Sequence, residues 1–135
     1  MKKNNLLLIL ALLTIVLMLP ACRTAPVYNV HNAGIPTTQN APMTMEKVTA
    51  AIIKAGGGLG WNMRPIKPGL IEATLNIRAH QAIVNITYDE ANYNIDYKSS
   101  NNLKYNGTKI HSNYNGWIQN LSRAINNQLA TAQYE

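Results

Sequence analysis

The sequence predicts an α+β fold in which an antiparallel sheet of about four strands, with a short hairpin, packs an N-terminal and a C-terminal helix on one face. Two observations indicate this fold. Apolar residues recur at helical spacing near both ends of the domain, and between them they alternate with polar residues at a period of two. Because each strand is apolar on one side only, the other face of the sheet is expected to meet water.

The first helix is expected over residues 44–55. Thr44 is placed to cap it, since a threonine hydroxyl accepts from the free amides of a first turn. The apolar positions that follow at helical spacing are Met45, Val48, Ile52 and Ala55. Gly56-Gly57-Gly58 predicts the helix end, because glycine readily adopts positive φ. This run leads into no helix, so it does not fit a phosphate-binding loop.

The period changes to two from Trp61 onward. Pro65 and Pro68 cannot donate to a sheet ladder, so the strand that begins there is expected at an edge of the sheet. Pro68-Gly69 predicts a turn. Three longer strands follow, with apolar positions at Ile71, Ala73, Leu75 and Ile77, then Ala82, Val84, Ile86 and Tyr88, then Tyr93, Ile95 and Tyr97.

Asn106-Gly107 predicts a two-residue hairpin, because a type I′ turn needs positive φ at both positions. The turn would place Leu103 beside Ile110 on the buried face. Lys104 would then lie opposite Lys109 in water, at a small electrostatic cost.

The C-terminal segment has the pattern of an amphipathic helix. Its apolar stripe consists of Tyr114, Trp117, Ile118, Leu121, Ile125 and Leu129. Ser112 or Asn113 is expected to cap it. Trp61 and Trp117 are expected to be core anchors between the sheet and the helices.

The N-terminus carries a separate signal. Lys2 and Lys3 precede an apolar run from Leu6 to Leu19, which is shorter than the roughly 20 residues of a membrane span but typical of a secretory signal. Leu19-Pro20-Ala21-Cys22 resembles the lipobox of bacterial lipoproteins. The domain behind it resembles small uncharacterised envelope lipoproteins.

This resemblance implies that residues 1–21 are a signal peptide removed on export. Cys22 would then carry diacylglycerol on its sulfur and an acyl chain on its amine, and several chains are what stable anchoring requires. Arg23 stands where enterobacterial lipoproteins retained at the inner membrane carry Asp. In a Gram-negative source, the resemblance therefore implies an outer-membrane protein that faces the periplasm. The alternative is an ordinary cleaved signal with an incidental thiol.

Residues 22–42 are expected to form the lipidated cysteine and a flexible tether, ahead of a small α+β domain over 43–135. The tether segment is rich in proline and small polar residues, and no apolar period persists in it. In the alternative, this segment docks on the domain through Val27, Tyr28, Val30 and Ile35.

The charge of the chain argues against nucleic acid as a partner. The formal net charge is +6, and the loss of Lys2 and Lys3 with the leader lowers it to +4. A basic surplus that small, on a protein outside the cytoplasm, is not the footprint of a nucleic-acid-binding domain.

The sequence contains no motif for catalysis or metal binding. His31, His80 and His111 have no metal-ligand spacing, and Cys22 is assigned to lipid. Asp89-Glu90 falls in a predicted turn, and no serine stands in a Gly-x-Ser-x-Gly motif. We therefore expect a protein that is not an enzyme and has no metal and no cofactor other than the covalent lipid.

The outward face of the sheet is the candidate binding face. It is expected to consist of Thr74, Asn76, Arg78, Asn85, Thr87 and Lys98. Such amides and hydroxyls suit polar partners, although a face that only keeps the protein soluble has the same composition. Arg64 and Lys67 are expected near Arg78 at one sheet end, and the sheet edges are a further candidate surface. The expected function is binding to another envelope protein or support of an envelope assembly, and the alternative is peptidoglycan or glycan binding.

Overall fold

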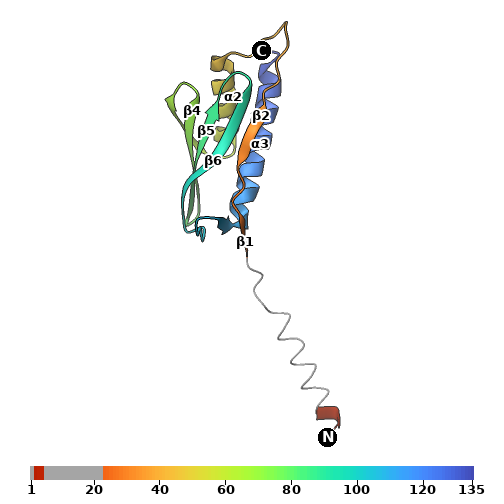
Figure 1. Cartoon of the computed structure of the whole chain (residues 1–135), viewed down its shortest axis with the longest axis vertical. Helices are drawn as coiled ribbons and strands as arrows, with labels where there is room; N and C mark the ends of the chain where they lie inside the picture. Colours follow the sequence, from red (N-terminus) through yellow and green to blue (C-terminus); the bar gives the residue numbers. More distant parts are fainter. Residues whose placement is uncertain (1, 5–22) are drawn as a thin grey trace.

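The computed structural model describes residues 2–4 and 23–135, so Cys22 and most of the leader lie outside the described residues. The domain is α+β, as the sequence predicts, with two helices on one face of an antiparallel sheet (Figure 1). Among the described residues, no helix combines the length and the apolar content needed to cross a membrane.

The sheet has five strands rather than four. Their order is β2 (Val30–Gly34), β6 (Asn92–Asn101), β5 (His80–Tyr88), β4 (Leu70–Ile77) and β3 (Asn62–Lys67). A separate two-stranded sheet pairs β1 (Thr24–Pro26) with β7 (Lys109–His111). The helices are α2 (Met45–Gly58) and α3 (Ser112–Ala132), which lie side by side.

The elements gather at two opposite ends of the molecule. The β1 end contains β1, β7, the start of α3, the β4–β5 turn at residues 78–79 and the loop of residues 102–108. The far end contains the β3–β4 and β5–β6 turns, the start of α2 and the C-terminus (Figure 1).

The predicted alternation of the three long strands is confirmed. On β4 and β5, Ile71, Val84 and Ile86 are fully buried, and on β6 so are Tyr93 and Ile95. The helices close this core with a fully buried set consisting of Val48, Ile52, Tyr114, Ile118, Leu121, Ile125 and Leu129. Of the two expected anchors, Trp61 is buried, whereas Trp117 is only partly buried at the margin of the core.

The N-terminal helix is capped as predicted but ends later. Thr44 Oγ1 accepts a hydrogen bond from the Lys47 amide. The helix continues through the three glycines to Gly58, and the positive φ of 87° occurs at Gly60. The first of these glycines, Gly56, is buried against Met63 of β3, so close packing rather than helix termination explains it.

The edge strand is confirmed, and so is the turn at Pro68-Gly69. Gly69 has a φ of 82°, and a Cβ there would lie 2.9 Å from the Tyr88 carbonyl oxygen. Both the left-handed backbone and the close approach therefore require glycine at this turn.

The prediction of a two-residue hairpin at Asn106-Gly107 is wrong. Leu103 and Ile110 are buried as expected, but residues 103–105 form no strand, and the ladder partner of Lys109–His111 is β1. The His111 amide still donates to the Leu103 carbonyl oxygen. Gly107 has a φ of 101°, while Asn106 is not in the positive-φ region that type I′ requires. Its side-chain oxygen instead accepts from the amides of Thr108 and Lys109, which is the local bond that asparagine offers a tight turn.

The prediction of a flexible tether is also wrong for residues 23–42, the described part of that segment. The alternative, in which the segment docks on the domain, describes it better. β1 and β2 both belong to sheets, and Val30 and Ile35 are buried in the core. Val27 packs against the core, while Tyr28 is 41% exposed. The Ser112 amide donates to the Arg23 carbonyl oxygen at 2.8 Å, and His111 rather than Ser112 or Asn113 caps α3. Docking therefore begins at the first residue after Cys22.

Candidate functional site

Five of the six residues of the candidate binding face lie on the open face of the sheet. Because Ile71, Ala73 and Leu75 point into the core, the intervening residues of β4 point outward, and the same argument applies to β5. This places Thr74, Asn76, Asn85 and Thr87 on the open face. Lys98 joins them, since its ammonium group contacts Glu72. Arg78 does not, because it lies in the β4–β5 turn with a φ of 55°.

A cluster of charged groups occupies the middle of this face. Glu72 of β4 accepts from Arg64 of edge strand β3 and from Lys98 of β6. The bond from Lys98, and after it the bond from Arg64, lowers the pKa of the Glu72 carboxyl below its ordinary value of 4.5. The carboxylate therefore stays ionised and paired at neutral pH, and both of its oxygens are already occupied.

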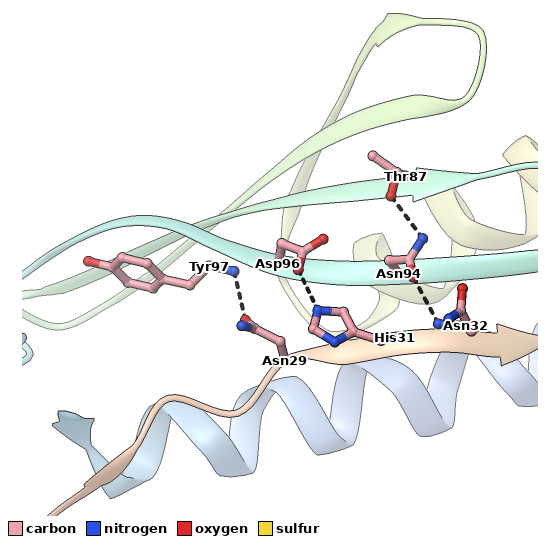
Figure 2. A network of polar contacts seen from close by, with 7 residues as sticks. All are labelled: Asn29, His31, Asn32, Thr87, Asn94, Asp96 and Tyr97. Carbon is pink, nitrogen blue, oxygen red and sulfur yellow. Dashed lines mark hydrogen bonds and ion pairs between the residues drawn. The ribbon is translucent and has the colours of Figure 1, made fainter. Parts of the chain in front are cut away.

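The other side of the face is a network that joins β2 to β6 (Figure 2). His31 Nε2 lies 2.8 Å from Asp96 Oδ1, and the Asn32 amide donates to Asn94 Oδ1 at 2.8 Å. Asn94 also donates to Thr87 Oγ1 at 3.1 Å. These side-chain bonds lie where the β2–β6 register shifts between Val30 and Ala33, so they supply contacts that the interrupted ladder does not.

Most of the charged and hydrogen-bonding side chains discussed for the open face therefore bond to one another. Its two carboxylates, Glu72 and Asp96, each contact a basic side chain of another strand. Asn76 accepts from Gln81, and Thr87 from Asn94. Within residues 2–4 and 23–135, no three His, Cys, Asp or Glu side chains converge as a metal site requires.

The expectation that Arg64, Lys67 and Arg78 cluster at one end of the sheet is wrong. Arg64 lies opposite Glu72 in the β3–β4 register and bonds to it. Lys67 ends β3 at the far end, whereas Arg78 lies beyond Ile77 at the other end of β4. Antiparallel pairing of β3 with β4 separates these two cations by the length of the strand pair.

A groove at the far end was not predicted from the sequence. It lies between the start of α2 and edge strand β3 and has a volume of about 410 Å³, against about 120 and 80 Å³ for two other hollows. We call it the distal groove, and its lining residues are Met45, Glu46, Thr49, Pro65, Ile66, Lys67, Pro68 and Tyr88. The sequence pattern that could have indicated it is Pro65-Ile66-Lys67-Pro68, in which an isoleucine lies between two prolines on an edge strand. In the structure the Ile66 side chain is 46% exposed.

The distal groove has few polar groups, and two of its hydroxyls form a short chain of hydrogen bonds. The Thr49 hydroxyl donates to the Met45 carbonyl oxygen at 2.7 Å. Because a threonine hydroxyl has one proton, the 2.7 Å contact with Tyr88 makes Tyr88 the donor to Thr49. The Tyr88 oxygen keeps acceptor capacity, and the remaining lining is mostly apolar apart from Glu46 and Lys67.

Comparison of the chain with protein-family models, with curated proteins and with solved structures finds no match.

Proposed function

We propose that this chain is a non-enzymatic protein of the bacterial cell envelope, anchored by lipid on Cys22, that binds another envelope protein in the distal groove. In a Gram-negative cell the anchor lies in the outer membrane and the domain faces the periplasm. The observation that carries the binding proposal is an apolar groove with an exposed isoleucine at the far end, opposite β1.

The position of the groove supports a protein partner that approaches from the aqueous side. Thr24 begins β1 two residues after Cys22, so the anchor belongs to the β1 end of the molecule. The groove is lined by the β3–β4 turn and by Tyr88 at the end of β5, which belong to the far end. A lipid-anchored domain therefore presents this groove away from the membrane.

The lining of the groove supports an extended segment with a large apolar side chain as its occupant. Ile66 and Pro65 supply apolar area on the edge strand, and Met45 supplies a side chain that adapts to its partner. Edge strand β3 borders the groove, and edge strands accept extended segments of other proteins. Glu46 and Lys67 add one charge of each sign, which suits a segment with little net charge.

The open face gives less support to the glycan alternative. A glycan-binding face needs free hydrogen-bonding groups, whereas Glu72, Asp96 and Asn94 are bonded to neighbouring strands. Replacement of these bonds by bonds to a sugar would return little free energy, since a typical net hydrogen bond contributes only about 1 kcal/mol.

Site-specific photocrosslinking in intact cells tests the proposal. A photoreactive residue replaces Ile66 in the distal groove, and matched variants carry it at Thr74 on the open face and at Arg123, an exposed position of α3. The expected result is one reproducible protein adduct from position 66 that positions 74 and 123 do not give. Mass spectrometry of the same preparation identifies the adduct and measures the mass of the N-terminal peptide at Cys22.

Two results would overturn parts of the proposal. Adducts with peptidoglycan from position 74, and none from position 66, would make the open face a glycan-binding surface. Sedimentation of the protein with purified sacculi would then have to be lost in a Thr74→Ala, Asn85→Ala variant. An N-terminal peptide without acyl chains would refute the anchor and leave the groove result to be judged on its own.

A further inference from the structure

The β1 end begins directly after the anchoring cysteine. The Arg23 carbonyl oxygen is bonded to the Ser112 amide, and Thr24–Pro26 is paired with Lys109–His111. Consecutive Cα atoms are about 3.8 Å apart, so a lipid on Cys22 is one residue from the folded surface. A domain held in this way has no tether with which to stand off the membrane.

Hydrogen bonds join the remaining parts of the β1 end to the same surface. His80 Nδ1 lies 2.7 Å from the Asn102 carbonyl oxygen, and Asn102 Nδ2 donates to the Ala79 carbonyl oxygen at 3.3 Å. The His111 amide donates to the Leu103 carbonyl oxygen at 2.8 Å. The β4–β5 turn, the loop of residues 102–108 and the β1–β7 sheet therefore form one connected surface.

Charge is distributed unequally along the molecule. Arg23, Arg78, Lys104 and Lys109 are all exposed at the β1 end. In the described part of the chain, the ion pairs link His31 to Asp96 and Glu72 to Arg64 and Lys98, so none involves these four cations. The carboxylates lie elsewhere: Glu72 and Asp96 on the open face, and Glu46, Asp89, Glu90 and Glu135 at the far end.

Two of these cations have an unusual backbone conformation. Arg78 and Lys104 have φ values of 55° and 53°, a left-handed conformation that glycine and asparagine adopt more readily than long side chains do. Two of the four cations thus occupy positions where the backbone favours a different residue. Beside them Tyr105 is 42% exposed, and tyrosine is enriched at the headgroup level of membrane proteins.

We propose that the β1 end rests on the membrane and that Arg23, Arg78, Lys104 and Lys109 bind the headgroups of anionic phospholipids. This inference rests on the proposed lipid anchor and adds the orientation of the domain and the chemistry of its second contact. The anchor supplies attachment, and the cations fix which end faces the bilayer.

Hydrogen exchange on the full acylated protein in vesicles tests this orientation. Vesicles of phosphatidylcholine alone are compared with vesicles that also contain phosphatidylglycerol. The amides of residues 102–108 are expected to exchange more slowly in the anionic vesicles, while those of the β5–β6 turn at residues 89–91 exchange at the same rate in both. High salt is expected to remove the difference, because it screens exposed charges beyond a few ångströms.

Charge removal provides the matched variants. Each Lys or Arg near an anionic surface contributes about a fivefold factor in association, so Lys104→Gln with Lys109→Gln should lower the docked-to-undocked ratio about thirtyfold. Lys47→Gln with Lys54→Gln removes the same charge from α2, outside both the β1 end and the distal groove, and should leave the protection of residues 102–108 unchanged.

Equal exchange of residues 102–108 in both vesicles, in protein whose N-terminal peptide carries acyl chains, would refute the docking and leave the anchor standing. Equal loss of protection in both double variants would refute the assigned face, since net charge alone would then explain binding. An N-terminal peptide without acyl chains would refute the anchor and, with it, this inference.

Discussion

Two adjacent glycines in the last turn of α2 offer a sharp test of the packing between α2 and β3. A Cβ added at Gly57 meets no atom of the described residues within 4 Å, whereas a Cβ at Gly56 lies 2.6 Å from Met63 Cε and closer still to Met63 Sδ. Gly57→Ala and Gly56→Ala are the same chemical change one residue apart, and we expect opposite effects on the free energy of unfolding.

The magnitudes follow from two opposing terms. Alanine is favoured over glycine inside a helix by roughly 0.5–1 kcal/mol, so Gly57→Ala should stabilise the protein by about that amount. At Gly56 the same gain is opposed by overpacking, which costs about 1–3 kcal/mol. Met63 is unbranched and its outer atoms can shift, which favours the lower half of that range. The net expectation for Gly56→Ala is a loss of about 1 kcal/mol.

Urea unfolding, followed by tryptophan fluorescence, measures both variants. Met63→Ala supplies the control: in that background the added methyl group meets open space, so Gly56→Ala should become stabilising by about 0.5–1 kcal/mol. If Gly56→Ala stabilises the protein as much as Gly57→Ala does when Met63 is intact, then Met63 does not pack on Gly56, and the assigned contact between α2 and β3 is wrong.

Two further predictions concern buried hydroxyls and pH. Tyr114 Oη is buried without a hydrogen-bond partner among the described residues, and burial raises the pKa of this hydroxyl, whereas Tyr93 Oη bonds to Ser122 and Asn126. Thermal unfolding should show Tyr114→Phe to be neutral or stabilising by about 1 kcal/mol and Tyr93→Phe to be destabilising by about 1–3 kcal/mol, and the reverse order would refute the assigned partners. The lowered pKa of the Glu72 carboxyl stabilises the fold above the ordinary value of 4.5, and this contribution is lost as pH falls through the folded-state pKa. Glu72→Gln should therefore reduce the fall in melting temperature between about pH 7 and about pH 3, and an unchanged fall would show that Arg64 and Lys98 do not interact with this carboxylate in solution.

The core of this fold could be predicted because alternation at a period of two has one physical cause. A strand with one buried face must place its apolar residues at every second position, and β4, β5 and β6 do so with Ile71, Val84 and Ile95 among the buried residues. The edge position of β3 was predictable for a similar reason, since Pro65 cannot donate to a neighbouring strand.

The N-terminal strands could not be predicted, because the information that fixes them is not local. β2 has few apolar residues, and Val30 alone among its members is buried. Side-chain amides add to its ladder with β6: Asn29 accepts from the Tyr97 amide at 2.9 Å, and Asn94 accepts from the Asn32 amide (Figure 2). Asparagine is common in loops as well, so only the three-dimensional pairing distinguishes a strand held by amides from a tether.

The candidate site was limited by the same lack of non-local information. Thr74, Asn85 and Thr87 were placed on the open face correctly, because the strand pattern alone fixes which way they point. The distal groove joins Met45 of α2 to Pro68 and Tyr88, residues of three elements whose proximity no sequence period encodes. Only Ile66, an apolar residue between prolines on an edge strand, pointed to it.

Docking of the N-terminal segment changes what the proposed anchor permits. A tether of some twenty extended residues would let the domain move tens of ångströms above the membrane, at about 3.3 Å per residue. With docking at Arg23, the height of the domain instead follows α3, which runs from the β1 end to the far end over 21 residues, or about 30 Å at 1.5 Å per residue. With the β1 end on the membrane, as proposed, the distal groove lies at about that height, and a protein that binds there would have to approach within about 30 Å of the membrane. Under the proposed anchor and docking, a partner attached to the same membrane meets this condition, and the geometry favours it over a partner held at a distant layer of the envelope.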